Sequence, residues 1–259
     1  MHDKKTVIIT GGNGLIGRTL ANHLCGTGYK VIVVDITPQS PDLDTLIDFI
    51  QFDLTNLSEF DRLMDMICEK TNNLYGLVNN AAFNPRVEDE KGFGDLNTLT
   101  IDIWRREFEL NLTAPVFLIQ ALLPHFNRRL NEYCKIVNVI STYGIVAPNQ
   151  GIYKSISQKS GASFMKPLTY SVSKAGLHMV TKYLSTHPDF KAINVNSIAP
   201  GGIQNGQDSQ FIEDYSNLVP MGRMAIPEEM LGTFELLLSG GSNYIQGQII
   251  TVDGGWTVW

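Results

Sequence analysis

The sequence lacks the patterns that mark several classes of protein. It has only three cysteines, Cys25, Cys68 and Cys134, and no Cys-x-x-Cys pair, so we expect neither a disulfide framework nor a metal site. No run of Lys and Arg occurs and the formal net charge is −6, which argues against nucleic acid as a partner. Without a signal-peptide pattern or an apolar run long enough to span a bilayer, the chain is expected to be cytoplasmic and to have no membrane partner.

What the sequence does contain is a regular alternation of apolar strands and amphipathic helices. Short runs rich in Val and Ile predict strands at residues 7–10, 30–35, 49–53, 74–79, 134–140, 193–198 and 248–252. Helical patterns fall between them, at residues 15–24, 57–68, 101–127 and 170–185, with Asn56 as the expected N-cap of the second, and another helix opens at Pro227. We therefore predict an α/β fold of the Rossmann type, a doubly wound sheet of about seven parallel strands in the order 3-2-1-4-5-6-7, in a single domain over residues 1–259.

Three stretches interrupt this rhythm, at residues 83–99, 142–169 and 203–225. The first two follow the carboxyl ends of predicted strands, where open α/β sheets bind ligands. We expect all three to form loops around a substrate. Within the third, residues 211–215 are either a mobile lid or an ordinary surface helix.

The first strand leads into a glycine-rich turn, Thr10-Gly-Gly-Asn-Gly-Leu-Ile-Gly17, in which residues 12–17 satisfy the G-x-G-x-x-G pattern. Glycines there allow a tight turn and let the backbone approach a pyrophosphate, which then faces the free N–H groups of the next helix. The alternative is a tight turn without a ligand. The predicted dinucleotide contacts are Gly11, Asn13, Gly14, Leu15, Ile16 and Gly17.

Asp35 ends the second predicted strand. A carboxylate at this position accepts hydrogen bonds from the adenosine ribose hydroxyls, whereas the 2′-phosphate of NADP would meet a like charge. Ile36 and Thr37 supply no compensating cation, although Arg18 lies nearby in the predicted helix. The sequence therefore favours NAD over NADP.

Tyr170 and Lys174 lie four residues apart on one predicted helix. A tyrosine pKa is about 10, and a neighbouring cation lowers it. With Lys174 and an oxidised nicotinamide nearby, Tyr170 can exchange a proton with a substrate hydroxyl or carbonyl while a hydride moves. The spacing is weak evidence when taken alone, because an exposed Tyr/Lys pair arises readily by chance.

Two further residues give the pair its context. Ser141 ends the fifth predicted strand and can orient the reacting oxygen, although a strand-end serine also commonly caps a turn. Asn111 lies inside a predicted helix, where asparagine is unfavourable, and Pro115 follows it by one turn. We expect a local kink there and a water between Asn111 and Lys174 that relays the proton.

In this order, these residues resemble the short-chain dehydrogenase/reductase family. The Asn79-Asn-Ala-Ala82 strand end, Pro200-Gly201 and Val252-Asp-Gly-Gly255 add to the resemblance, which covers nearly the whole chain. It implies a catalytic tetrad of Asn111, Ser141, Tyr170 and Lys174, with Tyr170 and Lys174 also holding the cofactor, and a homodimer or homotetramer. It also implies cofactor contacts at Asp53, Leu54, Asn80, Ala81, Ala82, Pro200, Gly201 and Ile203.

The chain departs from the family pattern in two ways. Its glycine spacing is that of the longer branch that modifies sugar nucleotides, yet the Asp253-Gly-Gly ending belongs to the shorter dehydrogenase branch. Too few residues follow Pro200 for a separate substrate domain, which favours the short branch. The gap between Ser141 and Tyr170 is also much longer than usual. Ser157 lies at the usual interval but does not end a strand, so Ser141 is preferred.

The run Ser141-Thr-Tyr-Gly-Ile-Val-Ala-Pro148 is similar to a bacterial subgroup of the family linked to the modification of flagellin and surface glycans. The resemblance implies an NAD-dependent alcohol/ketone oxidoreductase acting on a small sugar, amino sugar or related polar substrate. The alternatives are an NAD-binding regulatory or partner protein, and a sugar epimerase or dehydratase that recycles NAD. Arg86, Tyr143 and Tyr153 are the candidate substrate contacts, with Arg86 placed to pair with an anion or to be a solvated loop residue.

Overall fold

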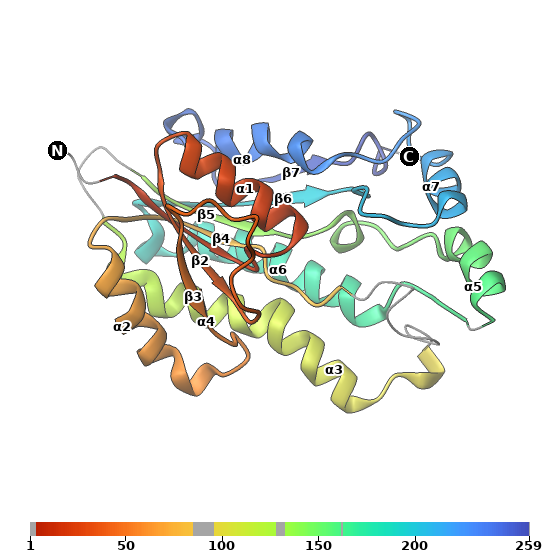
Figure 1. The fold of residues 1–259 in the computed structure, drawn as a ribbon, viewed down its shortest axis with the longest axis horizontal. Coiled ribbons are helices and arrows are strands. Elements are labelled where there is room, and N and C mark those ends of the chain that lie inside the picture. The colour runs from red at the N-terminus through yellow and green to blue at the C-terminus, as the bar shows by residue number, and fades with distance from the viewer. Residues whose placement is uncertain (1–3, 85–95, 128–132, 162, 259) are drawn as a thin grey trace.

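The computed structural model describes residues 4–84, 96–127, 133–161 and 163–258. Its centre is a seven-stranded, fully parallel sheet in the order β3-β2-β1-β4-β5-β6-β7 (Figure 1). The strands are β1 Thr6–Thr10, β2 Lys30–Asp35, β3 Asp48–Gln51, β4 Leu74–Asn79, β5 Cys134–Val139, β6 Ile193–Pro200 and β7 Ile249–Val252. The predicted fold class and strand order are confirmed.

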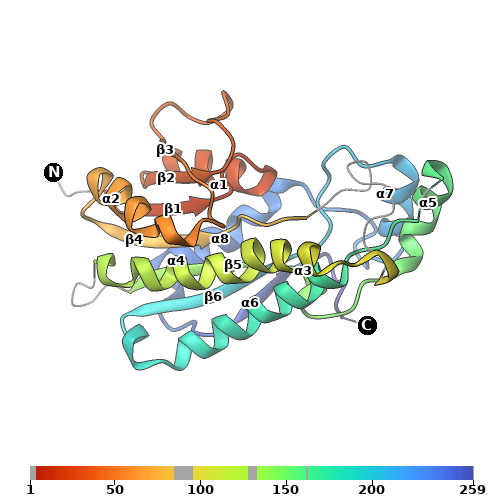
Figure 2. The same cartoon turned by 90° about the horizontal axis from the view of Figure 1, so that it is seen from below.

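Helices cover both faces of the sheet, because the strands carry apolar side chains on both sides. Along β1, Val7 and Ile9 pack toward α1 and α8, while Ile8 packs toward α2 and α4. Figures 1 and 2 show α1 and α8 on one face, and α2, α4 and α6 on the other. The helices are α1 Leu15–Gly26, α2 Phe60–Lys70, α3 Ile101–Phe108, α4 Ala114–Leu122, α5 Lys154–Ser160, α6 Leu168–Thr186, α7 Ser209–Ser216 and α8 Leu231–Leu238.

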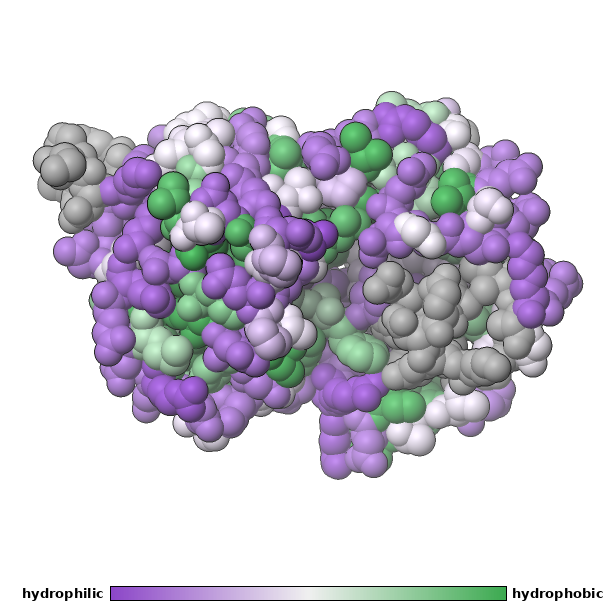
Figure 3. All heavy atoms as spheres, in the orientation of Figure 1, coloured by the Kyte–Doolittle hydropathy of each residue, from purple (hydrophilic) through white to green (hydrophobic). Residues whose placement is uncertain are grey.

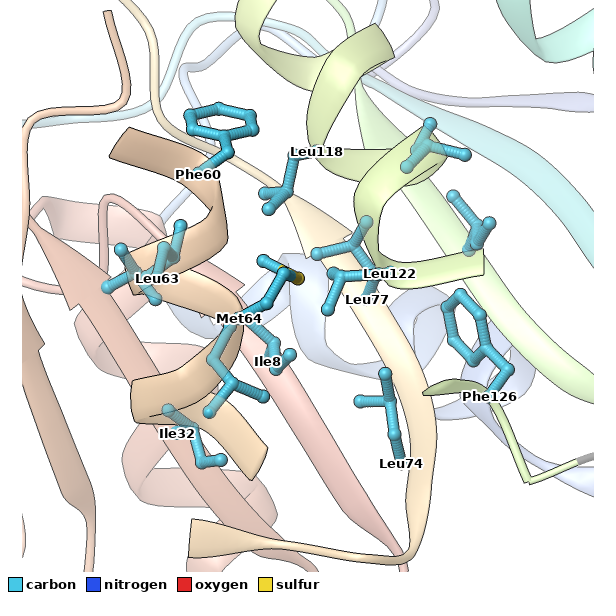
Figure 4. Packing of buried hydrophobic residues seen from close by; sticks show 14 of the residues in the cluster. Ile8, Ile32, Phe60, Leu63, Met64, Leu74, Leu77, Leu118, Leu122 and Phe126 are labelled. Carbon is cyan, nitrogen blue, oxygen red and sulfur yellow. The ribbon is translucent and has the colours of Figure 1, made fainter. Parts of the chain in front are cut away.

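The larger core cluster fixes the strands that carry the ligand edge. Side chains from α2 and α4 meet over β1 and β4, and burial of each such Leu or Phe contributes about 1.5–3 kcal/mol. Figure 4 shows this packing, with the labelled residues Ile8, Ile32, Phe60, Leu63, Met64, Leu74, Leu77, Leu118, Leu122 and Phe126. The carboxyl ends of neighbouring strands are therefore held in register.

The helix predicted at residues 101–127 contains an irregular turn. Helix α3 runs into a π-helical turn at Glu109–Thr113, α4 follows, and a 3₁₀ turn at Leu123–His125 ends the helix before the predicted boundary. A π turn adds one residue to the helical repeat and often occurs at functional sites. The irregularity expected around Asn111 is present.

The insertion at residues 142–169 is more ordered than the predicted loop. It contains 3₁₀ turns at Thr142–Gly144 and Gln150–Tyr153, followed by helix α5. In Figures 1 and 2, α5 lies beside α7 beyond the carboxyl ends of the strands. The stretch proposed as a lid or surface helix forms most of α7.

The start of the second helix also differs from the prediction. A 3₁₀ turn at Leu57–Glu59 precedes α2, and Asn56 makes no side-chain capping bond. The Asn56 Oδ1 atom instead accepts a hydrogen bond from the Ser58 hydroxyl at 2.9 Å. In the described part of the chain, no helix is both long enough and apolar enough to cross a membrane.

Candidate active site

A cavity of about 860 Å³ follows the carboxyl edge of the sheet. It runs from the ends of β1 and β2, past the ends of β4 and β5, to β6 and helix α7. Figure 3 shows a hollow near the middle of one face, between the part that carries the sheet and the part that carries α5 and α7. A cavity of this size is at the upper end for a single small-molecule site, so it has room for a long ligand or for a cofactor together with a substrate.

The glycine turn forms one end of the cavity. Gly11 has φ +64°, and a Cβ there would lie 2.8 Å from the Ala81 Cα. Gly14 precedes α1 without a side-chain cap, so the first N–H groups of the helix face the cavity. Gly17 lies beneath the turn rather than on the wall, and a Cβ there would lie 2.3 Å from the Gly11 carbonyl oxygen. The other predicted dinucleotide contacts of this turn line the cavity: Gly11, Asn13, Gly14, Leu15 and Ile16.

Asp35 is held rigidly at the end of β2. Its Oδ2 accepts a hydrogen bond from the Asn13 backbone N–H at 3.0 Å, and its Oδ1 accepts bonds from the Thr37 N–H and hydroxyl at 3.0 and 2.9 Å. Arg18, the nearby cation, forms an ion pair with Asp42 at 2.6 Å and is not among the residues described as lining the cavity. Asp35 thus presents a fixed carboxylate at this end.

The remaining predicted cofactor residues lie along the same wall. Asn80 ties β4 to the glycine turn, because its side-chain amide donates to the carbonyl oxygens of Thr10 and Gly11 at 2.9 and 3.0 Å. A glycine cradle that a Cβ would fill, next to a fixed acidic strand end, fits a dinucleotide. The residues that line this part are Asp53, Leu54, Asn80, Ala81, Ala82, Pro200, Gly201 and Ile203.

Three of the four predicted tetrad residues meet at the centre of the cavity. Tyr170 and Lys174 reach it from α6, and Ser141 reaches it from the end of β5. The Lys174 ammonium donates to the Val139 carbonyl oxygen at 2.8 Å. The Ser141 hydroxyl also accepts a hydrogen bond from the Tyr143 N–H at 3.2 Å. Ser141 therefore both caps the turn that follows β5 and presents its hydroxyl to the cavity, so the two roles considered for it occur together.

Asn111 lies behind this group, fully buried in the π turn. Its Oδ1 accepts a hydrogen bond from the Phe83 N–H at 2.7 Å, and its Nδ2 donates to the Phe83 carbonyl oxygen at 3.1 Å. Nδ2 also donates to the Ser173 hydroxyl at 3.4 Å, next to Lys174. The side chain that was expected to hold a water thus anchors the chain after β4.

The charge state of Tyr170 differs from the expectation that Lys174 lowers its pKa. Burial raises the pKa of Tyr170 to about 12, and hydrogen bonding with Ser141 offsets only part of this. Burial also lowers the pKa of Lys174 to about 8, and its ammonium lies 5.9 Å from the centre of the Tyr170 ring. Desolvation disfavours the charged form of both groups, so the protein by itself keeps Tyr170 protonated.

A second buried lysine lies against the same tyrosine. The Lys166 ammonium is 4.1 Å from the centre of the Tyr170 ring and donates to the Asn84 side-chain oxygen. Sequence reasoning missed Lys166, which is followed by Pro167 in the insertion and belongs to no motif. Arg86, the predicted anion contact, lies outside the described residues.

The substrate end of the cavity is rich in aromatic side chains. Tyr143 and Tyr153, both predicted substrate contacts, line it, with their hydroxyls 3.4 Å apart. Tyr215 stacks on Trp256 at 4.4 Å between ring centres and also lines the wall. Further lining residues are Asn84, Arg106, Lys166, Asn205, Gln207, Phe211 and Met224, and all but Arg106 lie in the three stretches predicted to surround a substrate, although they were not singled out there as substrate contacts. They carry no motif, because contacts across the fold bring them together.

Ser157, the residue at the usual family interval, has a structural role. Its hydroxyl donates to the Tyr153 carbonyl oxygen at 2.8 Å and accepts from the Phe164 N–H at 2.9 Å. It is not among the described lining residues. The geometry thus agrees with the preference for Ser141.

With this geometry in place, comparison with known proteins identifies the family. A short-chain dehydrogenase family model, described as enoyl-(acyl carrier protein) reductase, matches residues 13–257. The chain belongs to the short-chain dehydrogenase/reductase family. Among its relatives in that family, the 7alpha-hydroxysteroid dehydrogenase of Bacteroides fragilis is 28% identical and covers 99% of this chain and 95% of its own length. Post-translational flagellin modification protein A of Campylobacter coli is 26% identical over 99% of each chain.

A solved short-chain dehydrogenase shows the same architecture. The enzyme from Leptospira borgpetersenii, with bound NAD⁺, superposes with a TM-score of 0.83 at 28% identity, over 98% of this chain and 93% of its own. The resemblance predicted from the sequence is confirmed for the family, and a flagellin modification protein is among the relatives. The chain is therefore an oxidoreductase of the short-chain dehydrogenase/reductase type, with a nicotinamide cofactor site.

Proposed function

We propose that this protein is an NAD-dependent oxidoreductase that interconverts an alcohol and a ketone, with Tyr170 as the general acid/base. The observation that carries the proposal is the position of the Tyr170 phenol on the cavity wall, next to Ser141 and Lys174 and in the same cavity as the glycine cradle. A buried proton-transfer group beside a dinucleotide site is the arrangement that hydride transfer needs.

The proton moves through residues of this chain. In the oxidation, the substrate O–H proton passes to the Tyr170 phenolate as the substrate C–H hydride leaves, and the C–O bond becomes a carbonyl. In the reduction, the Tyr170 phenol returns that proton to the forming alkoxide. Ser141 donates a hydrogen bond to the reacting oxygen, and the charge of Lys174 favours the phenolate. The bound dinucleotide supplies the hydride acceptor or donor.

The proposed cofactor is NAD rather than NADP. The support is the Asp35 carboxylate, fixed by Asn13 and Thr37, and the pairing of Arg18 with Asp42 instead of with the cavity. A 2′-phosphate at Asp35 would meet a like charge with no cation from the described lining residues beside it.

The proposed substrate is a sugar, an amino sugar or a related polar metabolite. Polar groups of Asn84, Asn205 and Gln207 line the substrate end, together with the hydroxyls of Tyr143 and Tyr153. The flagellin modification relative supports a link to surface modification. The aromatic rings also offer flat faces to the apolar side of a sugar ring.

The test is the formation of NADH from a panel of polyols, sugars and hydroxy acids, with Tyr170→Phe as the paired variant. We expect turnover of at least one class of alcohol by the native protein, and a loss of about 10²–10⁴-fold in the variant, with NADH binding retained. Full activity in Tyr170→Phe would remove the role of this residue. NAD binding without turnover on the whole panel would favour a regulatory or partner protein, and a cofactor that is never released would favour an epimerase or dehydratase.

We also propose a homo-oligomer in the cytoplasm. Helix α6 carries a stripe of exposed apolar side chains, which would be covered in a helical interface. The stripe consists of Leu168, Val172, Met179 and Tyr183. Light scattering should give a dimer or tetramer mass, and Met179→Glu should lower it to the monomer.

A further inference from the structure

The substrate end of the cavity carries a positive charge that lies outside the predicted tetrad. Lys166 and Lys174 lie against one ring, with their ammonium nitrogens 4.1 and 5.9 Å from the centre of Tyr170. Lys174 is held by the Val139 carbonyl oxygen. Lys166 comes from the insertion before α6 and is only 9% exposed. The insertion therefore contributes a buried cation to the wall of the cavity.

The protein compensates the Lys166 charge only in part. An ammonium has three N–H donors. Within the described residues, the Lys166 ammonium has one hydrogen-bond acceptor, the Asn84 side-chain oxygen. No carboxylate of the described chain forms an ion pair with it. Burial lowers the pKa of Lys166 to about 7, the charge of Glu107 raises it and that of Lys174 lowers it further. A buried cation is costly unless it is paired, and a perturbed cation in a cavity marks a candidate binding group.

Charges are separated along the cavity. The acidic lining residues of the described chain, Asp35 and Asp53, are at the nucleotide end. The substrate end has Lys166 and, at the rim, Arg106, whose guanidinium lies over the Phe83 ring at 4.4 Å. Because the whole chain has a net charge of −6, this positive end is a local feature, and it would attract an anionic substrate.

We propose that Lys166 binds a carboxylate of the substrate, which narrows the polar metabolites proposed above to a hydroxy acid and its keto acid, in place of a neutral sugar, an amino sugar or a polyol. This inference rests on the proposed oxidoreductase function, which brings the reacting oxygen to the Tyr170 hydroxyl. Since Lys166 lies against the ring that carries that hydroxyl, the carboxylate must be close to the reacting carbon.

A carboxylate suits this place better than a phosphate. The Lys166 ammonium and the neighbouring Asn84 amide together offer enough hydrogen-bond donors for the two oxygens of one carboxylate. Phosphate sites generally gather several donors, from arginines or from a helix N-terminus. Within the described chain, such a helix N-terminus faces the cavity at Gly14, at the nucleotide end.

The first experiment measures binding in the full-length protein with saturating NADH. Glycolate, its neutral amide glycolamide and inorganic phosphate are titrated, and tryptophan fluorescence is followed, because Trp256 stacks on the lining residue Tyr215. We expect glycolate to bind at least about tenfold more tightly than glycolamide, a ratio equal to about 1.4 kcal/mol. Equal affinity for the two would overturn the proposal, and tighter binding of phosphate than of glycolate would overturn the choice of a carboxylate.

Variants assign this preference to one residue. Lys166→Met and Lys166→Gln should bind glycolate and glycolamide with equal affinity, and Lys166→Arg should keep the preference for glycolate. Lys154→Met is the matched control, because Lys154 is exposed in the same insertion. Circular dichroism checks the fold of each variant, and Lys166→Gln keeps a donor for Asn84 should Lys166→Met be unstable. A ratio that persists in both neutral variants contradicts the proposal.

Activity separates this inference from the proposed function. Hydroxy acids and their primary amides are compared as substrates, and the native protein should show a higher kcat/KM for the acids, with the gain lost in Lys166→Gln. Turnover of neutral polyols with no advantage for the acids would refute the carboxylate site and leave the oxidoreductase function standing. A glycolate preference without turnover of any alcohol would refute the function and leave the binding site standing.

Discussion

The side chain of Asn111 holds the backbone of Phe83 through a pair of hydrogen bonds. The Phe83 N–H donates to the Asn111 Oδ1 at 2.7 Å, and the Asn111 Nδ2 donates to the Phe83 carbonyl oxygen at 3.1 Å. The π turn at Glu109–Thr113 directs this asparagine inward. The contact thereby joins the middle of a long helix to the chain after β4, where Ala81, Ala82 and Asn84 line the cavity. An irregular helix is thus part of the structure that shapes the site.

We predict that Asn111→Ala loosens this wall. The variant loses both hydrogen bonds between the Asn111 side chain and Phe83, and at about 0.5–1.5 kcal/mol each they together contribute about 1–3 kcal/mol. The free energy of unfolding, measured in urea, should fall by that amount, and the KM for NAD should rise. Asn217→Ala, at an exposed asparagine, is the control. Unchanged stability and an unchanged KM would show that the contact does not support the site.

The proposed role of Tyr170 predicts opposite pH profiles for the two directions. Alcohol oxidation needs the phenolate, and burial raises the pKa of Tyr170 to about 12, so kcat/KM for oxidation should rise with pH from about 6. The rise should slow between about pH 7 and 8, because the two cations beside Tyr170, Lys166 and Lys174, lose their protons there. Ketone reduction needs the phenol and should not rise over the same range. An oxidation rate that falls as pH increases would contradict this assignment.

Asp35 should set the choice of cofactor. Asp35→Asn removes the charge that opposes a 2′-phosphate, so the ratio of kcat/KM for NAD to that for NADP should fall by about 10–100-fold. The ratio is measured with one alcohol and both cofactors. Asp61→Asn, at an exposed carboxylate on α2, should leave it unchanged. A constant ratio in Asp35→Asn would mean that another group discriminates between the cofactors.

Gly17→Ala should disturb the cradle through the backbone. A Cβ at residue 17 would lie 2.3 Å from the Gly11 carbonyl oxygen, so the turn must move, and overpacking of this kind costs about 1–3 kcal/mol. Thermal unfolding and NADH titration should both show a loss. Gly26→Ala is the matched control in the same helix, because a Cβ there would meet nothing within 4 Å. It should stabilise the protein by about 0.5–1 kcal/mol. Equal behaviour of the two variants would contradict the packing argument.

The features predicted correctly from the sequence are those in which a local pattern has one structural solution. Buried Val/Ile runs give parallel strands, and β2 and β4 have their predicted bounds. The glycine turn and the acidic end of β2 are each recognised from residues that lie together in the chain, although Asp35 is held in place by Asn13, 22 positions away. Errors fall where local patterns have several solutions, as in the insertion that forms α5 and at Asn56, whose side chain bonds Ser58 rather than capping the helix.

The sequence by itself therefore determined the fold, the family and the residues expected to transfer the proton, because periodicity and motif order are carried along the chain. Only the tertiary structure decided what surrounds Tyr170. Lys166 meets Asn84 across 82 positions, and Asn111 meets Phe83 across 28. Burial, which reverses the expected direction of the Tyr170 pKa shift, is likewise a property of the whole fold. Contacts and desolvation depend on which distant segments pack together, and no spacing along the chain encodes that.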